Sequence, residues 1–272
     1  GYEDAVPIVT SKGTYAATFV NAEETQYLVI EDNFPNGRPD LEGRWVIYAD
    51  RETVDKVEKM KVCTCLNPLH TALAVFGCLL DHKLISQEMK DPELKKLVEI
   101  IGYVEGLPVV VDPGIIDPKE FIDTVIQTRF PNPFMPDTPQ RIATDTSQKL
   151  AIRFGETIKS YVSREDLSVD SLKLIPLVFA GWCRYLLAVD DNGIPFEPSS
   201  DPLLDSVQKH LHGIKLGDSG SFTEQLRPIL SNSSIFGVDL YEVGLGALVE
   251  KYFGELIAEK GAVRKTLKKY VN

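Results

Sequence analysis

The chain has 272 residues, of which 40 are acidic and 29 basic, and its formal net charge is −11. Its 43% hydrophobic and 25% charged content exclude intrinsic disorder, and the acidic balance disfavours nonspecific binding to nucleic acid. A chain of this length buries roughly three quarters of its unfolded surface, so it needs no disulfide or metal to fold. We expect one large domain or two small ones.

Cysteine usage and hydropathy indicate the cellular compartment in which the chain is expected. The four cysteines do not form a disulfide framework, because three crowd into sixteen residues and the fourth is remote: Cys63, Cys65, Cys78 and Cys183. They favour a reducing, cytoplasmic compartment. The longest apolar run, 172–189, contains Lys173 and Arg184, which predicts a buried helix rather than a membrane span. The acidic N-terminus shows no signal-peptide pattern.

The first 50 residues favour extended structure. The runs 27–30 and 45–48 are rich in β-formers, and residues 33–39 between them are rich in turn formers. These runs can pair as two strands. Two strands bury too little surface to stand alone, so we expect them to be an appendage.

Helical patterns dominate the rest. A helix over 69–80 is predicted after Asn67-Pro68, and others begin at Asp91-Pro92 and Asp117-Pro118, because proline is favoured at the first helical position. The four prolines within 131–139 predict irregular chain. Further helices are expected near 139–161, 168–189, 201–214, 221–231, 239–255 and 259–270. The predicted fold is mostly α, a multi-helical domain with a small extended or β appendage at its N-terminus.

Two kinds of site find no support. A dinucleotide site needs a glycine-rich turn between a strand and a helix, and the G-x-G at Gly244-Leu245-Gly246 follows no predicted strand. No cofactor-binding residue is therefore predicted. The residues that invite a metal do not have a familiar zinc spacing, so no metal site is predicted: Cys63, Cys65, His70 and Cys78.

A lysine, an asparagine and a histidine gather where the apolar helix begins: Lys61, Asn67 and His70. A desolvated lysine has a lowered pKa and can act as a base. An asparagine amide can donate to an alkoxide, and a histidine can bind a hydroxyl or carbonyl. The other interpretation, a helix cap followed by an amphipathic edge, stays open on residue types alone.

A second group follows the proline-rich stretch. On the predicted helix over 139–161, Arg141, Asp145 and Lys149 lie at i, i+4 and i+8 and share one face. This pattern is typical of a solvated charge stripe. It also suits an anion or polyhydroxyl site, because an arginine offers a planar fork of donors.

Together these motifs resemble the C-terminal part of the long-chain polyol dehydrogenases, the family of the mannitol dehydrogenases and hexuronate oxidoreductases. The family hallmark is a lysine followed by N-x-x-H at the start of a long apolar helix, matched here by Lys61 and Asn67-Pro68-Leu69-His70. Further matches run in the family's order from about residue 27 to about residue 268: Val29-Ile30-Glu31-Asp32, Phe34-Pro35-Asn36-Gly37-Arg38-Pro39, Asn132-Pro133, Arg141-Ile142-Ala143, Ser147-Gln148-Lys149, Ala180-Gly181-Trp182-Cys183-Arg184-Tyr185-Leu186, Asp190-Asp191-Asn192-Gly193 and Ile235-Phe236-Gly237-Val238-Asp239-Leu240.

The resemblance implies roles for these residues. Lys61 would be the general acid and base, Asn67 would hold the developing alkoxide, and His70 would orient the substrate. Arg141 and Lys149 match positions that line the substrate pocket, and Arg141 suits a uronate carboxylate. The family is zinc-independent, and hydride passes between a carbinol carbon, C5 of the sugar acid, and the nicotinamide of NAD.

Two departures from the family pattern stand out. The family spacing is lysine-x4-asparagine, whereas this chain has lysine-x5-asparagine, and one residue rotates a side chain by about 100° on a regular helix. We expect a bulge or an extended stretch to absorb it, with Lys59 as the alternative base. The family's N-terminal Rossmann-like domain is also absent. The resemblance therefore makes residues 1–55 an extended remnant of the nucleotide-binding domain and residues 56–272 the helical substrate-binding and catalytic domain.

The expected function is the catalytic domain of an NAD-dependent oxidoreductase that interconverts D-fructuronate and D-mannonate. NAD would be bound mainly by a domain outside this chain. The expected partners are a small sugar acid or polyol and that missing domain, with neither nucleic acid nor membrane. The alternatives are a mannitol or other polyol 2-dehydrogenase, and a catalytically silent helical binding or oligomerisation module.

Overall fold

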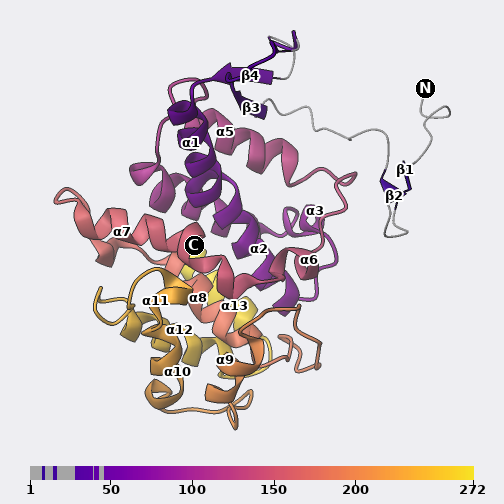
Figure 1. Cartoon of the computed structure of the whole chain (residues 1–272). Coiled ribbons are helices and arrows are strands. Elements are labelled where there is room, and N and C mark those ends of the chain that lie inside the picture. Colours follow the sequence, from indigo (N-terminus) through magenta and orange to yellow (C-terminus); the bar gives the residue numbers. More distant parts are fainter. Residues whose placement is uncertain (1–7, 10–14, 17–27, 39, 43–45) are drawn as a thin grey trace. The chain divides into compact units, whose positions relative to one another are not determined.

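The chain divides into two units, Gly1–Asp50 and Arg51–Asn272, and strands are found in the first (Figure 1). The computed structural model describes residues 8–9, 15–16, 28–38, 40–42 and 46–272. Strands β1 (Ile8–Val9) and β2 (Tyr15–Ala16) pair antiparallel, and β3 (Leu28–Glu31) and β4 (Val46–Ala49) pair parallel. The predicted strand pair is thus confirmed, although Tyr27 and Trp45 lie outside the described residues.

The helical unit is built around one long helical run. It consists of α1 (Arg51–Met60), the π-helical turn η2 (Lys61–Cys65) and α2 (Asn67–Leu79). Every residue of α2 after Asn67 is buried. By length and composition this run passes as a membrane span, but 89% of its apolar window is buried inside the protein, as in a core helix. The predicted domain boundary at 55/56 falls within α1.

Elements from much of the remaining chain pack around α2. Its neighbours include α4 (Pro92–Ile100), α6 (Pro139–Ala143) and α8 (Leu174–Tyr185), and α8 is itself buried throughout. The remaining helices are α3 (Ile85–Glu88), α5 (Pro118–Thr124), α7 (Glu156–Ser163), α9 (Leu204–His210), α10 (Thr223–Leu230), α11 (Ser233–Phe236), α12 (Gly246–Ile257) and α13 (Ala262–Val271). The mostly helical class is confirmed.

Short π and 3-10 turns interrupt or link these helices. The π-turns besides η2 are η3 (Ile101–Gly106), η5 (Val125–Arg129) and η7 (Ala151–Gly155). The 3-10 turns are η4 (Leu107–Val109), η6 (Thr146–Gln148) and η8 (Val169–Ser171). A π-turn accommodates one residue more than an α-helical turn does. The helical surface around α2 is therefore irregular where these turns occur.

Aspartates begin two helices as the sequence predicts. The Asp91 carboxylate accepts hydrogen bonds from the backbone N–H groups of Glu93 and Leu94, and Asp117 accepts one from Glu120. Each aspartate satisfies donors that a helix start otherwise leaves open. The proline that follows fits because it has no N–H to satisfy.

The predicted continuous helix over 139–161 is wrong. It is divided into α6, η6, η7 and α7, and Asp145 between α6 and η6 has a φ of 54°. Tertiary bonds explain the break: Asp145 N–H donates to the carbonyl of Ser200 at 2.8 Å, and Ser147 N–H donates to the Asp201 carboxylate at 2.8 Å. Hence Arg141, Asp145 and Lys149 do not form a stripe on one helix face.

The predicted helix over 239–255 begins later than expected, at Gly246. The N–H groups of Leu245 and Gly246 both donate to the carbonyl of Leu240, and Gly244 has a φ of 84°. Glycine adopts this left-handed conformation without strain, so residues 240–245 form a turn before the helix. The sequence pattern did not predict the short α11.

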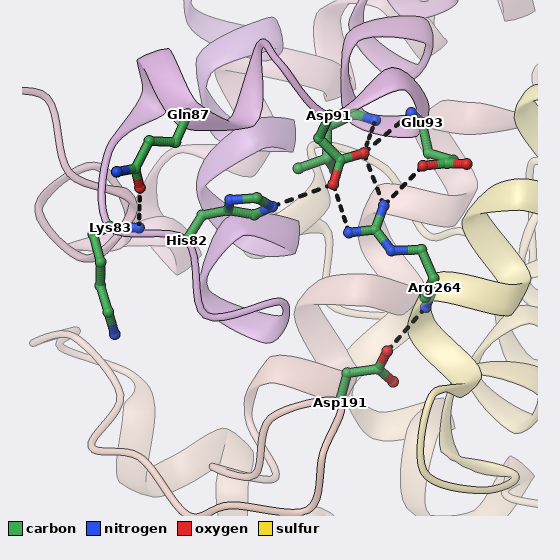
Figure 2. A network of polar contacts seen from close by, with 8 residues as sticks. His82, Lys83, Gln87, Asp91, Glu93, Asp191 and Arg264 are labelled. Carbon is green, nitrogen blue, oxygen red and sulfur yellow. Dashed lines mark hydrogen bonds and ion pairs between the residues drawn. The ribbon is translucent and has the colours of Figure 1, made fainter. Parts of the chain in front are cut away.

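An ionic network joins the start of α4 to α13 (Figure 2). The Arg264 guanidinium donates to both carboxylate oxygens of Asp91, at 2.8 and 2.5 Å, and to Glu93 at 2.9 Å. His82 lies on the other side of Asp91, with Nε2 3.3 Å from Oδ2. Asp191 caps α13 by accepting from the N–H groups of Val263 and Arg264. Residues near both ends of the helical unit are thereby tied together.

A second carboxylate near this network has no such partners. Glu88 is fully buried, and neither side-chain oxygen makes a hydrogen bond within the described part of the chain. It packs so tightly on α2 that a Cβ at Gly77 would overlap its Oε1. Burial, and then the nearby charge of Asp91, raise the pKa of Glu88 well above 4.5. The side chain therefore carries a proton where an exposed glutamate has lost it.

This proton makes stability depend on pH. The folded protein holds a proton on Glu88 that the unfolded chain releases above about pH 4.5, so the free energy of unfolding falls as the pH rises. The slope is about 1.4 kcal/mol per pH unit until the raised pKa is reached. We expect Glu88→Gln to remove this slope. In urea unfolding, the free energy of unfolding of the variant should therefore rise relative to that of the wild type between pH 4.5 and 7. Exposed Glu224→Gln is the control; equal slopes for Glu88→Gln and wild type would contradict the prediction.

Candidate active site

Lys61 is the first residue of the π-turn that joins α1 to α2. The N–H of Leu66 donates to the Lys61 carbonyl at 3.1 Å, an i to i+5 bond that closes the wide turn. The turn provides the bulge expected from the lysine-x5-asparagine spacing, because it absorbs one residue without changing the register on either side. Lys61 then takes the angular position that a lysine-x4-asparagine spacing gives on a regular helix.

The Lys61 ammonium group pairs with the carboxylate of Glu58. Nζ is 3.1 Å from Glu58 Oε1, and the side chain is 16% exposed. Glu58 also lines a cavity of about 460 Å³ with an apolar floor, bounded by Glu58, Lys59, Val62, Cys63, Ala151, Ile152, Glu156 and Lys159. Lys59 is exposed and belongs to the wall of this cavity. The Lys61 side chain is thus partly buried beside Glu58, whereas the cavity is lined by its neighbours in the chain, Lys59 and Val62.

Asn67 and His70 lie on the first turn of α2. His70 follows Asn67 three positions later, so the two residues share a face of the helix. His70 is buried, and its ring packs against Phe130 with ring centroids 5.1 Å apart. Its Nε2 is 3.4 Å from Asp137 Oδ2 and, within the described residues, makes no hydrogen bond. This buried ring nitrogen can therefore accept a ligand as its partner.

Asp137 is a site residue that the sequence did not single out. Its carboxylate is 8% exposed and meets three groups: His70 at 3.4 Å, Arg129 Nη1 at 3.8 Å and Arg141 Nη2, which donates to Oδ1. These neighbours, with His70 the largest cause, lower the pKa of Asp137 to about 2 although burial opposes them. The only local signal is its place just before Thr138, which caps α6.

His70 is neutral at pH 7. Burial lowers the pKa of its imidazole, and the cationic Arg129 and Arg153 lower it further, while Asp137 acts in the opposite direction. A neutral imidazole both donates and accepts hydrogen bonds. His70 can therefore orient a substrate hydroxyl or carbonyl without adding a charge.

Arg141 and Lys149 reach the same region from opposite sides of the break after α6. Arg141 is 61% exposed and is engaged by Asp137, which also faces His70. The Lys149 ammonium group donates to the backbone carbonyls of Thr144 and Ile142. Burial and then the charge of Arg153 lower the pKa of Lys149. The predicted residues thus lie near the His70 end of the site, though not as one helical stripe.

Arg153 is a second site residue missed in the sequence. It lies on the π-turn η7, and its Nη1 donates to the Thr71 hydroxyl at 2.5 Å. Thr71 follows His70 on α2 and itself donates to the carbonyl of Asn67 at 2.9 Å. Burial lowers the pKa of Arg153 to about 10. The one signal in the sequence was its position four residues after Lys149, and the predicted continuous helix over 139–161 would have misplaced its side chain.

The described residues give no site for a dinucleotide or a metal. Strand β4 passes to α1 through Asp50, so the strand-to-helix turn has no glycine and an acidic residue that repels phosphate. Among the side chains that the structure describes, no group of three or more His, Cys, Asp or Glu is placed to hold a metal ion. The polar groups that the described part of this region offers are those of Lys61, Asn67 and His70, with cations near His70.

The helical architecture is that of a sugar-alcohol dehydrogenase. A solved structure of Pseudomonas fluorescens mannitol 2-dehydrogenase, a ternary complex with NAD and D-mannitol, matches 98% of this chain and 52% of its own, with a TM-score of 0.74. Its sequence identity of 24% makes this a likeness of fold alone. Residues 53–253 match the mannitol dehydrogenase C-terminal domain. The chain belongs to the mannitol dehydrogenase family.

Two curated relatives point to one branch of that family. D-mannonate oxidoreductase of Thermotoga maritima is 60% identical over 273 residues, which cover 100% of this chain and 50% of the relative. D-mannonate oxidoreductase of Escherichia coli is 30% identical over 259 residues, which cover 94% of this chain and 49% of the relative. The chain thus spans about half the length of these relatives. The resemblance found in the motifs is confirmed.

The contacts of Asp137 give a testable consequence. Its lowered pKa contributes stability that is present above its ordinary value of 3.8 and is lost as the pH falls toward 2. We expect Asp137→Asn to lower the free energy of unfolding at pH 7 by about 1–2 kcal/mol, after allowance for solvent screening. The difference should shrink between pH 4 and pH 2 in urea unfolding. Asp166→Asn, which alters an exposed ion pair with Arg164, is the control; a pH-independent loss in Asp137→Asn would count against this account.

Proposed function

We propose that this chain is the substrate-binding and catalytic domain of an NAD-dependent oxidoreductase that interconverts D-mannonate and D-fructuronate. The observation that carries the proposal is the π-turn that leads from Lys61 into Asn67 and His70, in a chain 60% identical to a D-mannonate oxidoreductase. The reaction balances as D-mannonate plus NAD⁺ giving D-fructuronate, NADH and a proton. NAD, when bound, supplies or accepts the hydride.

Each of the three residues has a role that suits its environment. Lys61 gives a proton to the carbonyl oxygen during reduction and takes it back during oxidation, supported by its partial burial beside Glu58. Asn67, on the first turn of α2, donates its amide to the developing alkoxide. His70 orients the substrate through a neutral imidazole whose Nε2 lacks a hydrogen-bond partner within the described chain.

Local charge favours an acidic substrate over a neutral polyol. Four basic side chains lie in the region of His70: Arg129, Arg141, Lys149 and Arg153. Asp137 is the acidic side chain that faces the His70 ring. Asp145 and Asp201 also act on Lys149, so the four cations outnumber three carboxylates, whereas the whole chain has a formal charge of −11. A polyol 2-dehydrogenase remains the second candidate, supported by the likeness to mannitol 2-dehydrogenase.

The nucleotide must be held by a partner domain. The described residues do not fit a dinucleotide site, and the chain spans half of its relatives, so we propose that a separate nucleotide-binding domain completes the enzyme. We also propose a cytoplasmic location, supported by four buried cysteines that form no disulfide. A catalytically silent helical module is the third candidate, and it differs from the others in predicting no turnover.

The test joins this chain to the nucleotide-binding half of the Thermotoga maritima D-mannonate oxidoreductase. We expect this fusion to oxidise NADH in the presence of D-fructuronate. Lys61→Met should lower kcat by about 10²–10⁴, because the proton transfer loses its acid and base. Turnover is followed by NADH absorbance, with folding checked by circular dichroism.

Lys59→Met is the matched control, since Lys59 is the alternative base two residues away on α1. Near wild-type turnover in Lys59→Met supports Lys61, whereas loss in Lys59→Met with retention in Lys61→Met would transfer the role to Lys59. Turnover of D-mannitol but not D-mannonate would favour the polyol candidate. Absence of turnover with any hexuronate or ketose in a folded fusion would leave the silent module.

A further inference from the structure

Arg153 is an arginine without a counterion. Among the described residues, its guanidinium donates to the Thr71 hydroxyl alone, and no carboxylate lies within 4 Å of it. Two other arginines, one of them fully buried, are better compensated. Arg264 has the carboxylates of Asp91 and Glu93, and the fully buried Arg184 donates to three backbone carbonyls, those of Leu256, Val189 and Asp190.

The guanidinium is held firmly in this uncompensated position. The backbone N–H of Arg153 donates to the Lys149 carbonyl at 2.9 Å. The turn η7 packs so closely on α11 that a Cβ at Gly155 would overlap the carbonyl of Phe236. Thr71, which receives Nη1, is fixed to Asn67 on α2. The side chain is therefore preorganised at the first turn of α2, next to His70.

The neighbour of Arg153 adds to the unbalanced charge. Lys149 donates to backbone carbonyls, and no ion pair joins its ammonium group to a carboxylate in the part of the chain that the structure describes. Asp145 and Asp201 act on Lys149 from beyond ion-pair distance, whereas no charged group among the described residues offsets the partial burial of the Arg153 guanidinium, which costs free energy. An anionic group bound between Lys149 and Arg153 offsets this cost, and an arginine with most of its five N–H donors unused can hold a carboxylate in bidentate geometry.

We propose that Arg153 is the specificity-determining residue that binds the carboxylate of the sugar acid, with Lys149 as its helper. The inference rests on the proposed function, because it places the substrate against Asn67 and His70. It replaces the sequence-based expectation that Arg141 is the carboxylate's partner. Arg141 is largely exposed and its guanidinium already engages Asp137, whereas Arg153 has its donors free for a ligand.

Three basic residues each lie on a π-turn: Lys61 on η2, Arg129 on η5 and Arg153 on η7. Such turns are frequent at functional sites because they alter the direction of a side chain within an otherwise regular helix. Arg153 thus shares the local geometry of the proposed catalytic lysine.

Selectivity between two ketoses tests the proposal. D-fructuronate and D-fructose differ in a carboxylate against a hydroxymethyl group, so the ratio of their kcat/KM values reports recognition of the charge. In the fusion enzyme with NADH, we expect Arg153→Met to lower this ratio at least tenfold, mainly through KM for D-fructuronate. Arg153→Lys should restore part of it, because the charge is kept and the bidentate fork is lost. Arg164→Met, at an exposed arginine paired with Asp166, should stay within twofold of wild type.

A binding measurement accompanies the kinetics. D-mannonate should raise the melting temperature of the fusion more than D-mannitol does, and Arg153→Met should abolish the difference. Arg153→Gln serves in the same tests if the methionine variant does not fold.

Three outcomes overturn the inference, and they differ in what else they overturn. An unchanged ratio in a folded Arg153 variant of an active enzyme rejects it alone. Collapse of the ratio in Arg141→Met but not in Arg153→Met returns the carboxylate to Arg141. Absence of turnover of both ketoses by the wild-type fusion rejects the proposed function, and this inference with it.

Discussion

The burial of α2 is the constraint on which the rest of the helical unit depends. A helix covered on all sides after its first residue must be surrounded by elements from distant parts of the chain, and α4, α6 and α8 take these places. Asp137 and Arg153 meet α2 near its N-terminal end, at His70 and Thr71, whereas Glu88 packs against it further along, at Gly77.

Patterns within one element were predictable from the sequence, and contacts between elements were not. The aspartate-proline starts of α4 and α5, the apolar α2 and the Lys61, Asn67 and His70 motif all follow from local spacing. The break after α6 does not, because it depends on bonds from Asp145 to Ser200 and from Ser147 to Asp201. Asp137 and Arg153 escaped notice for the same reason, since the α2 residues that they meet, His70 and Thr71, are far away in the sequence.

The charge of the whole protein and the charge of its site are separate quantities. The net charge of −11 affects solubility and repels polyanions at long range. At short range, the pKa of His70 depends on its own surroundings: burial lowers it, Asp137 raises it, and Arg129 and Arg153 lower it further. Partial burial strengthens these local interactions relative to distant charges screened by salt. An acidic protein can thus present a cationic pocket.

The π-turn at Lys61–Cys65 also bears on how relatives are compared. A π-turn stores one additional residue as a widening of the helix, so the residues on both sides keep their positions in space while their numbering shifts by one. An alignment must open a one-residue gap inside a helix here, where gaps are usually penalised most. A motif search with a fixed lysine-to-asparagine spacing passes over such a chain, although the helix presents the same side chains. Counting turns rather than residues recovers the correspondence.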